Sequence, residues 1–184
     1  MRVTVLFALA ALVASALAGC SSGGSLPPLP ATNASEASYQ LGPGDKMHIN
    51  VFGAEDLTGD FVVGDTGSLS FPLIGDVKAA GLTPSQLTKS ISSRLADGFM
   101  RDPKVSVQVT TYRPFYIFGE VTRPGEYPYS AGMSVLNAVA LGGGYSYRAN
   151  QNYVVVRRDN KDYTADGQSH ILAGDIIRVP ERYF

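Results

Sequence analysis

A repeated pattern of glycines and acidic residues constrains the fold of this chain more than any other feature. Gly75-Asp76-Val77 is followed by Gly81, and Gly119-Glu120-Val121 is followed by Gly125, so the spacing G-[D/E]-V-x-x-x-G occurs twice. Repetition of turn residues at a fixed spacing is typical of chains built from related structural units. The sequence therefore predicts two related units that follow one another along the chain.

Each copy of this pattern precedes a predicted helix. Residues 83–86 (TPSQ) form a capping box with proline at the first helical position, and the helix they begin is placed to end at Gly98. A shorter second helix is predicted from Ser134 to about Leu141, before three glycines. The first helix has an apolar residue every four positions along one face: Leu87, Ile91 and Leu95.

A strand is predicted after each helix, at residues 105–109 and 153–156, from alternating or continuous apolar residues. Gly44-Asp45 and Gly174-Asp175 form a second repeated element, a turn that opens a strand. We therefore predict an α+β fold with two small, related, mostly antiparallel sheet units, each packed against one helix. The boundary between them is expected near residues 112–114.

The N-terminus has the form of a secretory signal peptide. Arg2 precedes a nearly unbroken apolar run from Val3 to Ala18, which is short for a spanning helix, although a signal-anchor helix is the alternative. Leu17-Ala18-Gly19-Cys20 resembles the lipobox of bacterial lipoproteins, which implies cleavage after residue 19 and lipid attachment at Cys20. A multiply acylated cysteine anchors a protein stably to a membrane.

The segment after the cysteine is predicted to be a flexible tether. Residues 20–38 consist mainly of Ser, Gly, Pro and Ala, a composition typical of linkers. Ser21 stands where an aspartate, in lipoproteins of enteric-type bacteria, favours retention in the inner membrane. The resemblance to lipoproteins therefore implies an outer-membrane location, with the protein lipid-anchored and facing the periplasm.

Composition excludes several classes of function. The 184 residues carry a net charge of −1, so there is no basic excess for nucleic-acid binding. The single cysteine excludes an internal disulfide framework and a cysteine-cluster metal site. No nucleotide-binding motif is present, so we expect the energy for any transport step to come from another protein.

Candidate catalytic residues have simpler structural interpretations. Four carboxylates directly follow turn glycines, where they are expected to accept backbone N–H groups rather than act as acid and base. The two histidines are far apart in sequence, and His48 lies on the polar side of a predicted strand. We therefore predict no catalytic residues, no cofactor and no metal site. The four carboxylates are Asp45, Asp76, Glu120 and Asp175.

Several motifs, taken in order, resemble a known family. Residues 41–45 (LGPGD), 71–77 (FPLIGDV) and 102–107 (DPKVSV) are similar to the periplasmic polysaccharide-export domain. Residues 119–127 and 172–180 are similar to the soluble-ligand-binding β-grasp domain. Together with the lipobox, this order resembles the outer-membrane polysaccharide export lipoproteins, with an export domain at residues 39–113 and a β-grasp domain at 114–184.

The resemblance implies a non-enzymatic function. Family members form ring-shaped oligomers that guide capsule or exopolysaccharide polymer through the periplasm, together with an inner-membrane polysaccharide copolymerase. This chain ends before the amphipathic helix with which well-known members cross the outer membrane, so it resembles a short form. A separate outer-membrane β-barrel protein is therefore an expected partner, in addition to the polymer and the membrane.

The loop after the second helix contains the candidate contact residues. Tyr145, Tyr147 and Arg148 could contact polymer or a neighbouring subunit, because tyrosine rings stack on the apolar faces of sugars. Packing in the core or in an interface is the alternative interpretation. The alternative function is a lipid-anchored periplasmic module that binds glycan without forming a conduit; a glycan-processing enzyme is the third possibility.

Overall fold

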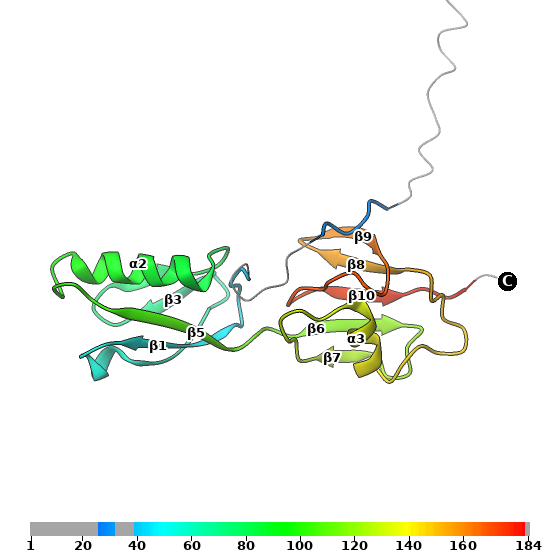
Figure 1. The fold of residues 1–184 in the computed structure, drawn as a ribbon, viewed down its shortest axis with the longest axis horizontal. Coiled ribbons are helices and arrows are strands. Elements are labelled where there is room, and N and C mark those ends of the chain that lie inside the picture. Colours follow the sequence, from blue (N-terminus) through cyan, green and yellow to red (C-terminus); the bar gives the residue numbers. More distant parts are fainter. Residues whose placement is uncertain (1–25, 32–38, 183–184) are drawn as a thin grey trace, which may run out of the picture.

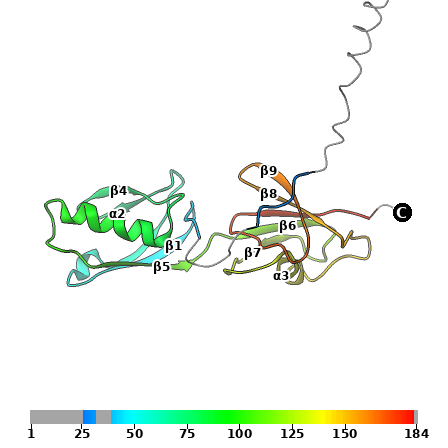
Figure 2. The same ribbon diagram turned by 45° about the horizontal axis from the view of Figure 1, so that its top comes forward.

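The computed structural model describes residues 26–31 and 39–182. Two domains lie end to end, and the chain crosses between them at residues 112–114, where one long strand leads into the next (Figures 1 and 2). The N-terminal domain contains helix α2, and the C-terminal domain contains helix α3.

The N-terminal domain packs α2 against a three-stranded antiparallel sheet with the order β2-β1-β5. A separate antiparallel hairpin, β3-β4, closes the domain beside the helix. Alternate residues of β1 are buried, as expected for a sheet with one face in the core. The elements are β1 (Lys46–Val51), η3 (Glu55–Leu57), β2 (Gly59–Val62), β3 (Ser68–Phe71), β4 (Gly75–Lys78), α2 (Pro84–Ala96) and β5 (Val105–Thr111).

Helix α2 forms as the sequence predicts. The Thr83 side chain accepts the Gln86 N–H at 3.2 Å, and the Gln86 side chain accepts the Thr83 N–H at 2.9 Å, so the capping box is complete. Gly98 adopts a φ of +90° just beyond the helix end. The predicted apolar face is fully buried in the core: Leu87, Ile91 and Leu95.

The C-terminal domain has one five-stranded sheet with the order β7-β6-β10-β8-β9. All neighbouring strands are antiparallel except β6 and β10, which are parallel. Helix α3 begins after Ser134, whose side chain accepts the Asn137 N–H in a second capping box. The elements are β6 (Phe115–Gly119), β7 (Gly125–Tyr127), α3 (Val135–Leu141), β8 (Val154–Arg158), β9 (Lys161–Ala165) and β10 (Ile176–Val179).

The two domains confirm the predicted α+β fold with two mostly antiparallel units, each with one packed helix. The repeated G-[D/E]-V pattern, however, takes different structural positions: Gly75 opens β4, whereas Gly119 ends β6. Both glycines have positive φ, +68° and +89°, and a glycine turn serves equally well to enter or leave a strand. The shared spacing therefore marks turns rather than equivalent strands.

Part of the predicted tether is held against the C-terminal domain. The Leu29 N–H donates to the Thr164 carbonyl at 2.7 Å, and the Thr164 N–H donates to the Pro27 carbonyl at 2.9 Å. This short segment runs parallel to β9 and covers its free edge (Figure 1). Residues 27–29 are thus bound to the domain, a contact that the linker composition does not predict. Within the described ranges, no helix combines the length and apolar character needed to cross a membrane.

Candidate functional site

Tyr145 belongs to the core rather than to the exposed part of its loop. It forms a β-bridge with Val121, and its half-buried ring packs against the hydrophobic core. Burial raises the pKa of the Tyr145 hydroxyl above its ordinary value. The structure therefore supports the packing interpretation for this residue.

Tyr147 and Arg148 lie at the surface of the same loop. The Tyr147 side chain is 83% exposed, the highest value among the large hydrophobic residues that the structure describes. Arg148 forms an ion pair with Glu181, and the Arg182 N–H donates to the Arg148 carbonyl at 2.8 Å. The C-terminal segment thus holds the loop in place while leaving the Tyr147 ring in solvent.

A polar pocket lies beside this loop, and we call it the end pocket. Its volume is about 370 Å³, within the range of small-molecule sites. The backbone that forms it is fixed, because the Asn150 N–H donates to the Pro180 carbonyl at 2.8 Å and the Asn152 N–H donates to the Asn150 side chain at 2.9 Å. Amide and guanidinium groups can bind sugar hydroxyls. The lining residues are Ala149, Asn150, Gln151, Asn152 and Arg182.

A second polar cluster joins the two domains, centred on the buried carboxylate of Asp45. This carboxylate accepts hydrogen bonds from the Tyr39 hydroxyl at 2.7 and 2.8 Å, from the Gly42 N–H at 2.8 Å and from the Arg113 N–H at 2.8 Å. The Arg113 guanidinium also forms an ion pair with this carboxylate, with 3.1 Å between the nitrogen and the oxygen. Burial, followed by the hydrogen bond to Asp45, raises the pKa of the Tyr39 hydroxyl well above its ordinary value.

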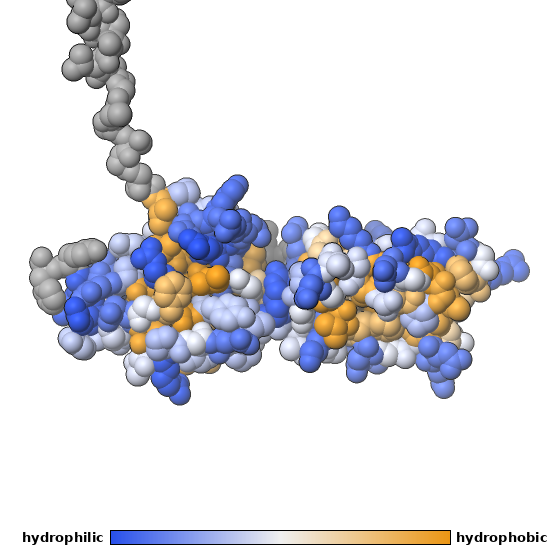
Figure 3. Space-filling model, turned by 180° about the vertical axis from the view of Figure 1, so that it is seen from behind, coloured by the Kyte–Doolittle hydropathy of each residue, from blue (hydrophilic) through white to orange (hydrophobic). Residues whose placement is uncertain are grey.

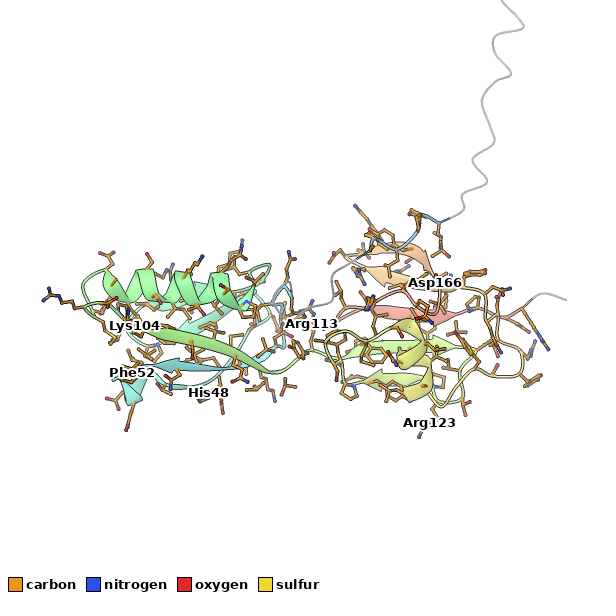
Figure 4. The ribbon with its side chains drawn as sticks, in the orientation of Figure 1. His48, Phe52, Lys104, Arg113, Arg123 and Asp166 are labelled. Atoms are coloured by element: carbon orange, nitrogen blue, oxygen red, sulfur yellow. The ribbon has the colours of Figure 1, made fainter. Side chains whose placement is uncertain are left out.

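Arg113 reaches both domains from its position between them (Figure 4). Its guanidinium lies against Gly42 of the first domain, and its Nε atom lies where a side chain at Gly174 of the second would begin, 2.8 Å from an ideal Cβ. Aromatic rings add to this junction: Tyr39 packs edge-on against Tyr112 at 4.7 Å, and Tyr112 packs edge-on against Tyr129 at 5.6 Å. We call these contacts the domain junction.

The second Gly-Asp turn has the same construction. Asp175 is 1% exposed and accepts the Leu172 N–H at 2.7 Å. Arg158, at the end of β8, binds it through two hydrogen bonds of 2.9 and 2.7 Å. Each domain thus contains a buried turn aspartate that accepts the N–H three residues earlier and pairs with an arginine.

The structural role predicted for the turn carboxylates holds for these two aspartates, but the prediction omits their arginine partners. Arg113 lies at the boundary expected between the two units, residues 112–114, and this is the sequence feature that could have indicated it. The other carboxylates differ: Asp76 is exposed on β4, and Glu120 accepts from the Ser146 hydroxyl. His48 lies on the exposed side of β1, as predicted, 2.8 Å from Asp60.

These sites contain hydrogen-bonding and aromatic groups. Among residues 26–31 and 39–182, no three His, Cys, Asp or Glu side chains gather as they would around a metal ion. Cys20, the predicted lipid-attachment residue, lies outside the described residues.

Comparison with protein families assigns both domains. Residues 33–110 match the family described as polysaccharide biosynthesis/export protein, and residues 114–170 match the SLBB domain. The two matches adjoin at the domain junction, on either side of Arg113.

Curated relatives carry related names. The chain is 39% identical over 154 residues to the exopolysaccharide production protein ExoF of Rhizobium meliloti. This aligned region covers 77% of this chain and 35% of that protein. It is 29% identical over 158 residues to the polysialic acid transport protein KpsD of Escherichia coli, covering 78% of this chain and 28% of the relative. It is also 29% identical to the EPS I polysaccharide export outer membrane protein EpsA of Ralstonia nicotianae, covering 76% of this chain and 40% of the relative. The chain thus spans well under half the length of each.

Proposed function

Because the chain belongs to the polysaccharide biosynthesis/export protein family, we propose that it is a non-enzymatic component of a system that exports capsule or exopolysaccharide. The observation that carries this proposal is the order of the two adjoining domain matches, over residues 33–110 and 114–170. The names of the relatives, which refer to exopolysaccharide production, polysialic acid transport and polysaccharide export, support the same process.

The protein is anchored by lipid at Cys20 and faces the periplasm from the outer membrane. The lipobox and Ser21 support this part of the proposal. Pro27 is bound at the edge of β9, so seven residue steps separate it from the anchor. At ~3.3 to 3.6 Å per residue, these steps span at most about 25 Å. The β9 edge of the C-terminal domain therefore lies near the membrane surface.

The chain acts as a ring-forming homo-oligomer that guides polymer, together with an inner-membrane polysaccharide copolymerase and a separate outer-membrane β-barrel protein. The family supports these partners. Tyr147 and the end pocket are the proposed polymer contacts, since an exposed aromatic ring beside amide groups suits a sugar chain. Arg148 positions the loop through Glu181.

Deletion of the gene, followed by assay of surface and secreted polysaccharide, tests the export role. We expect polymer to be lost from the surface and the medium. Complementation with Cys20→Ser should leave an unacylated protein that restores little export, whereas the wild type restores it fully. Normal secretion by the deletion strain would contradict the export proposal and favour the alternative, a lipid-anchored glycan-binding module, which the end pocket also suits.

Two further measurements test the assembly and the polymer contact. Analytical ultracentrifugation should detect oligomers, and a monomer at every concentration would count against the ring. Tyr147→Ala should reduce export while leaving the oligomer intact. Phe52→Ala is the matched control, because Phe52 is a comparably exposed aromatic, 79%, in the other domain. Equal export by both variants would remove Tyr147 from the polymer path.

A further inference from the structure

The five-stranded sheet of the C-terminal domain has an open outer face with an unusual composition. Phe115 and Ile117 of β6 point into the core, while Tyr116 and Phe118 between and beside them are 42% and 44% exposed. Helix α3 covers the opposite, inner face (Figure 1). Seen from behind, the domain shows hydrophobic side chains surrounded by hydrophilic ones (Figure 3). Exposed aromatic residues grouped on one face are typical of a binding surface.

Strand register places the outward-facing residues in two rows, which together we call the sheet face. Paired residues of neighbouring strands have their side chains on the same side of the sheet, in contact distance of one another. Tyr116 pairs with Ile176, Ile176 with Arg157, and Arg157 with Asp162. In the second row, Phe118 pairs with Arg178, and Arg178 pairs with Val155.

The two arginines of the sheet face differ in their partners. Arg157 donates to both oxygens of Asp162, at 2.6 and 3.1 Å, so its charge is compensated. Arg178 is exposed and has no hydrogen bond or ion pair within residues 26–31 and 39–182. The hydrogen bonds from Arg157, then the charge of Arg157 and last the charge of Arg178, hold the pKa of Asp162 below its ordinary value. Among the described residues, the face therefore offers one guanidinium, beside the Phe118 ring, that has no hydrogen-bonded partner.

The shape of the sheet face suits a chain lying across it. Phe118, Arg178 and their neighbours line a shallow depression of about 90 Å³, well below the ~300 to 1,000 Å³ of pockets that enclose small ligands. Strands β6, β10 and β8 each have a neighbour on both sides, so their backbone groups are already paired. An extended peptide cannot add a strand here, because strand addition needs a free sheet edge. Recognition must occur through side chains.

We propose that the sheet face binds the acidic sugar units of a polysaccharide, with Arg178 pairing a carboxylate and Phe118 stacking on the apolar face of the pyranose ring. A guanidinium and a carboxylate form strong charge-assisted hydrogen bonds. An aromatic ring packs against the apolar face of a sugar, whose hydroxyls remain free to form hydrogen bonds around it. A neutral sugar would offer Arg178 only hydroxyl acceptors, without the charge-assisted pair. This inference rests on the proposed function and specifies its substrate class as an anionic polymer.

The test uses a matched pair of probes and the full mature chain. Hexagalacturonate and its methyl ester have the same rings, but only the first carries carboxylates. In NMR titrations, hexagalacturonate should shift the amide signals of Phe118 and Arg178, and the ester should bind about tenfold or more weakly, since a charge-assisted hydrogen bond is lost. Arg178→Gln should weaken the binding of hexagalacturonate to the level of the ester. Phe118→Ala should weaken the binding of both probes.

Arg101→Gln is the control for net charge, because Arg101 is an exposed arginine of the N-terminal domain. It should bind hexagalacturonate like the wild type. Equal affinity for the two probes, equal weakening by the Arg101 and Arg178 variants, or no shifts on the sheet face would overturn the proposal. So would variants that alter sedimentation of the protein alone and leave probe binding unchanged, since the face would then be a contact with a second copy.

The failure of this proposal is distinguishable from failure of the export role. If the deletion strain secretes polymer normally, the export role is wrong whatever the titrations show. If deletion blocks secretion, while Arg178→Gln and Phe118→Ala bind hexagalacturonate and restore secretion like the wild type, the sheet-face proposal alone is wrong.

Discussion

Asp45 and Asp175 occupy equivalent positions in two turns, one in each domain, and each buried carboxylate binds an arginine that follows or ends a strand. The Arg113 pair with Asp45 measures 3.1 Å, and the Arg158 pair with Asp175 measures 2.7 Å. The first pair also joins the domains, because Arg113 contacts Gly174 of the second. The Asp175–Arg158 pair thus stabilises a turn of the C-terminal domain. The Asp45–Arg113 pair stabilises a turn of the N-terminal domain and also the contact between the domains.

Arg113→Gln should destabilise the protein and loosen the domain junction. The substitution leaves Asp45 buried without a charged partner, although three neutral donors remain. We expect a loss of about 1 to 3 kcal/mol in the free energy of unfolding, since water reaches the guanidinium and the remaining donors limit the cost. Urea denaturation measures this loss in the free energy of unfolding, with Arg101→Gln as the matched surface control. A loss no greater than that of the control would show that the pair contributes nothing.

Arg158→Gln should cost more than Arg113→Gln. The Arg158 and Asp175 side chains are 12% and 2% exposed, against 27% and 0% for the other pair, so water compensates less for the lost charge. Urea midpoints of the two variants, measured under identical conditions, test this order. The reverse order would mean that the domain contact of Arg113 outweighs the deeper burial of Arg158.

Gly119→Ala should be far more destabilising than Gly75→Ala. Both glycines have positive φ, so each substitution carries a backbone cost of ~1 to 2 kcal/mol. A Cβ at Gly119 would lie 2.2 Å from the Val179 carbonyl oxygen, whereas a Cβ at Gly75 would meet no atom within 4 Å. Because the obstacle is backbone, β6 and β10 must separate. Thermal unfolding compares the two variants, and similar melting temperatures would contradict the steric argument.

Stability should fall above about pH 10, the ordinary pKa of tyrosine, and Tyr39 should account for part of this fall. The folded protein raises the pKa of Tyr39, so the unfolded chain loses the proton first and stability declines as the pH rises through that value. Tyr39→Phe should be less stable at pH 8, because it lacks the hydrogen bond to Asp45, but should lose less between pH 8 and pH 10.5. Urea unfolding at both values measures the difference, and an equal loss in wild type and variant would exclude Tyr39 as a cause.

Leu29→Asp should release the tether from β9. The Thr164 N–H is bound by the Pro27 carbonyl at 2.9 Å, and Leu29 packs against the core beside it. A charged side chain at this half-buried position disfavours docking, so hydrogen exchange at the Thr164 amide should accelerate while amides of β8 keep their protection. Ala31→Asp, two residues further along the chain at an exposed position, is the charge control. Unchanged exchange at Thr164 would show that the segment does not protect this edge.

Local patterns predicted much of the fold because they depend on neighbours in sequence. The capping boxes at Thr83 and Ser134 act within one helical turn, and alternation along β5 decides which side of a strand faces the core. The loop residues of the candidate site were found in the same way, from an aromatic-rich segment after a helix. Their separation into a packed Tyr145 and an exposed Tyr147 was not predictable, because it depends on a β-bridge to Val121.

The sequence by itself determined the helices, the strands β1, β5, β8 and β10, the two-unit α+β organisation and the turn role of Asp45 and Asp175. Only the tertiary structure decided the arginine partners, the docking of residues 27–29 on β9 and the exposed rows of the sheet face. Asp45 and Arg113 are 68 residues apart, and Arg157 and Arg178 share one face of the sheet only because β8 and β10 are neighbours. Contacts of this kind depend on how strands are ordered and domains joined, which spacing along the chain does not specify.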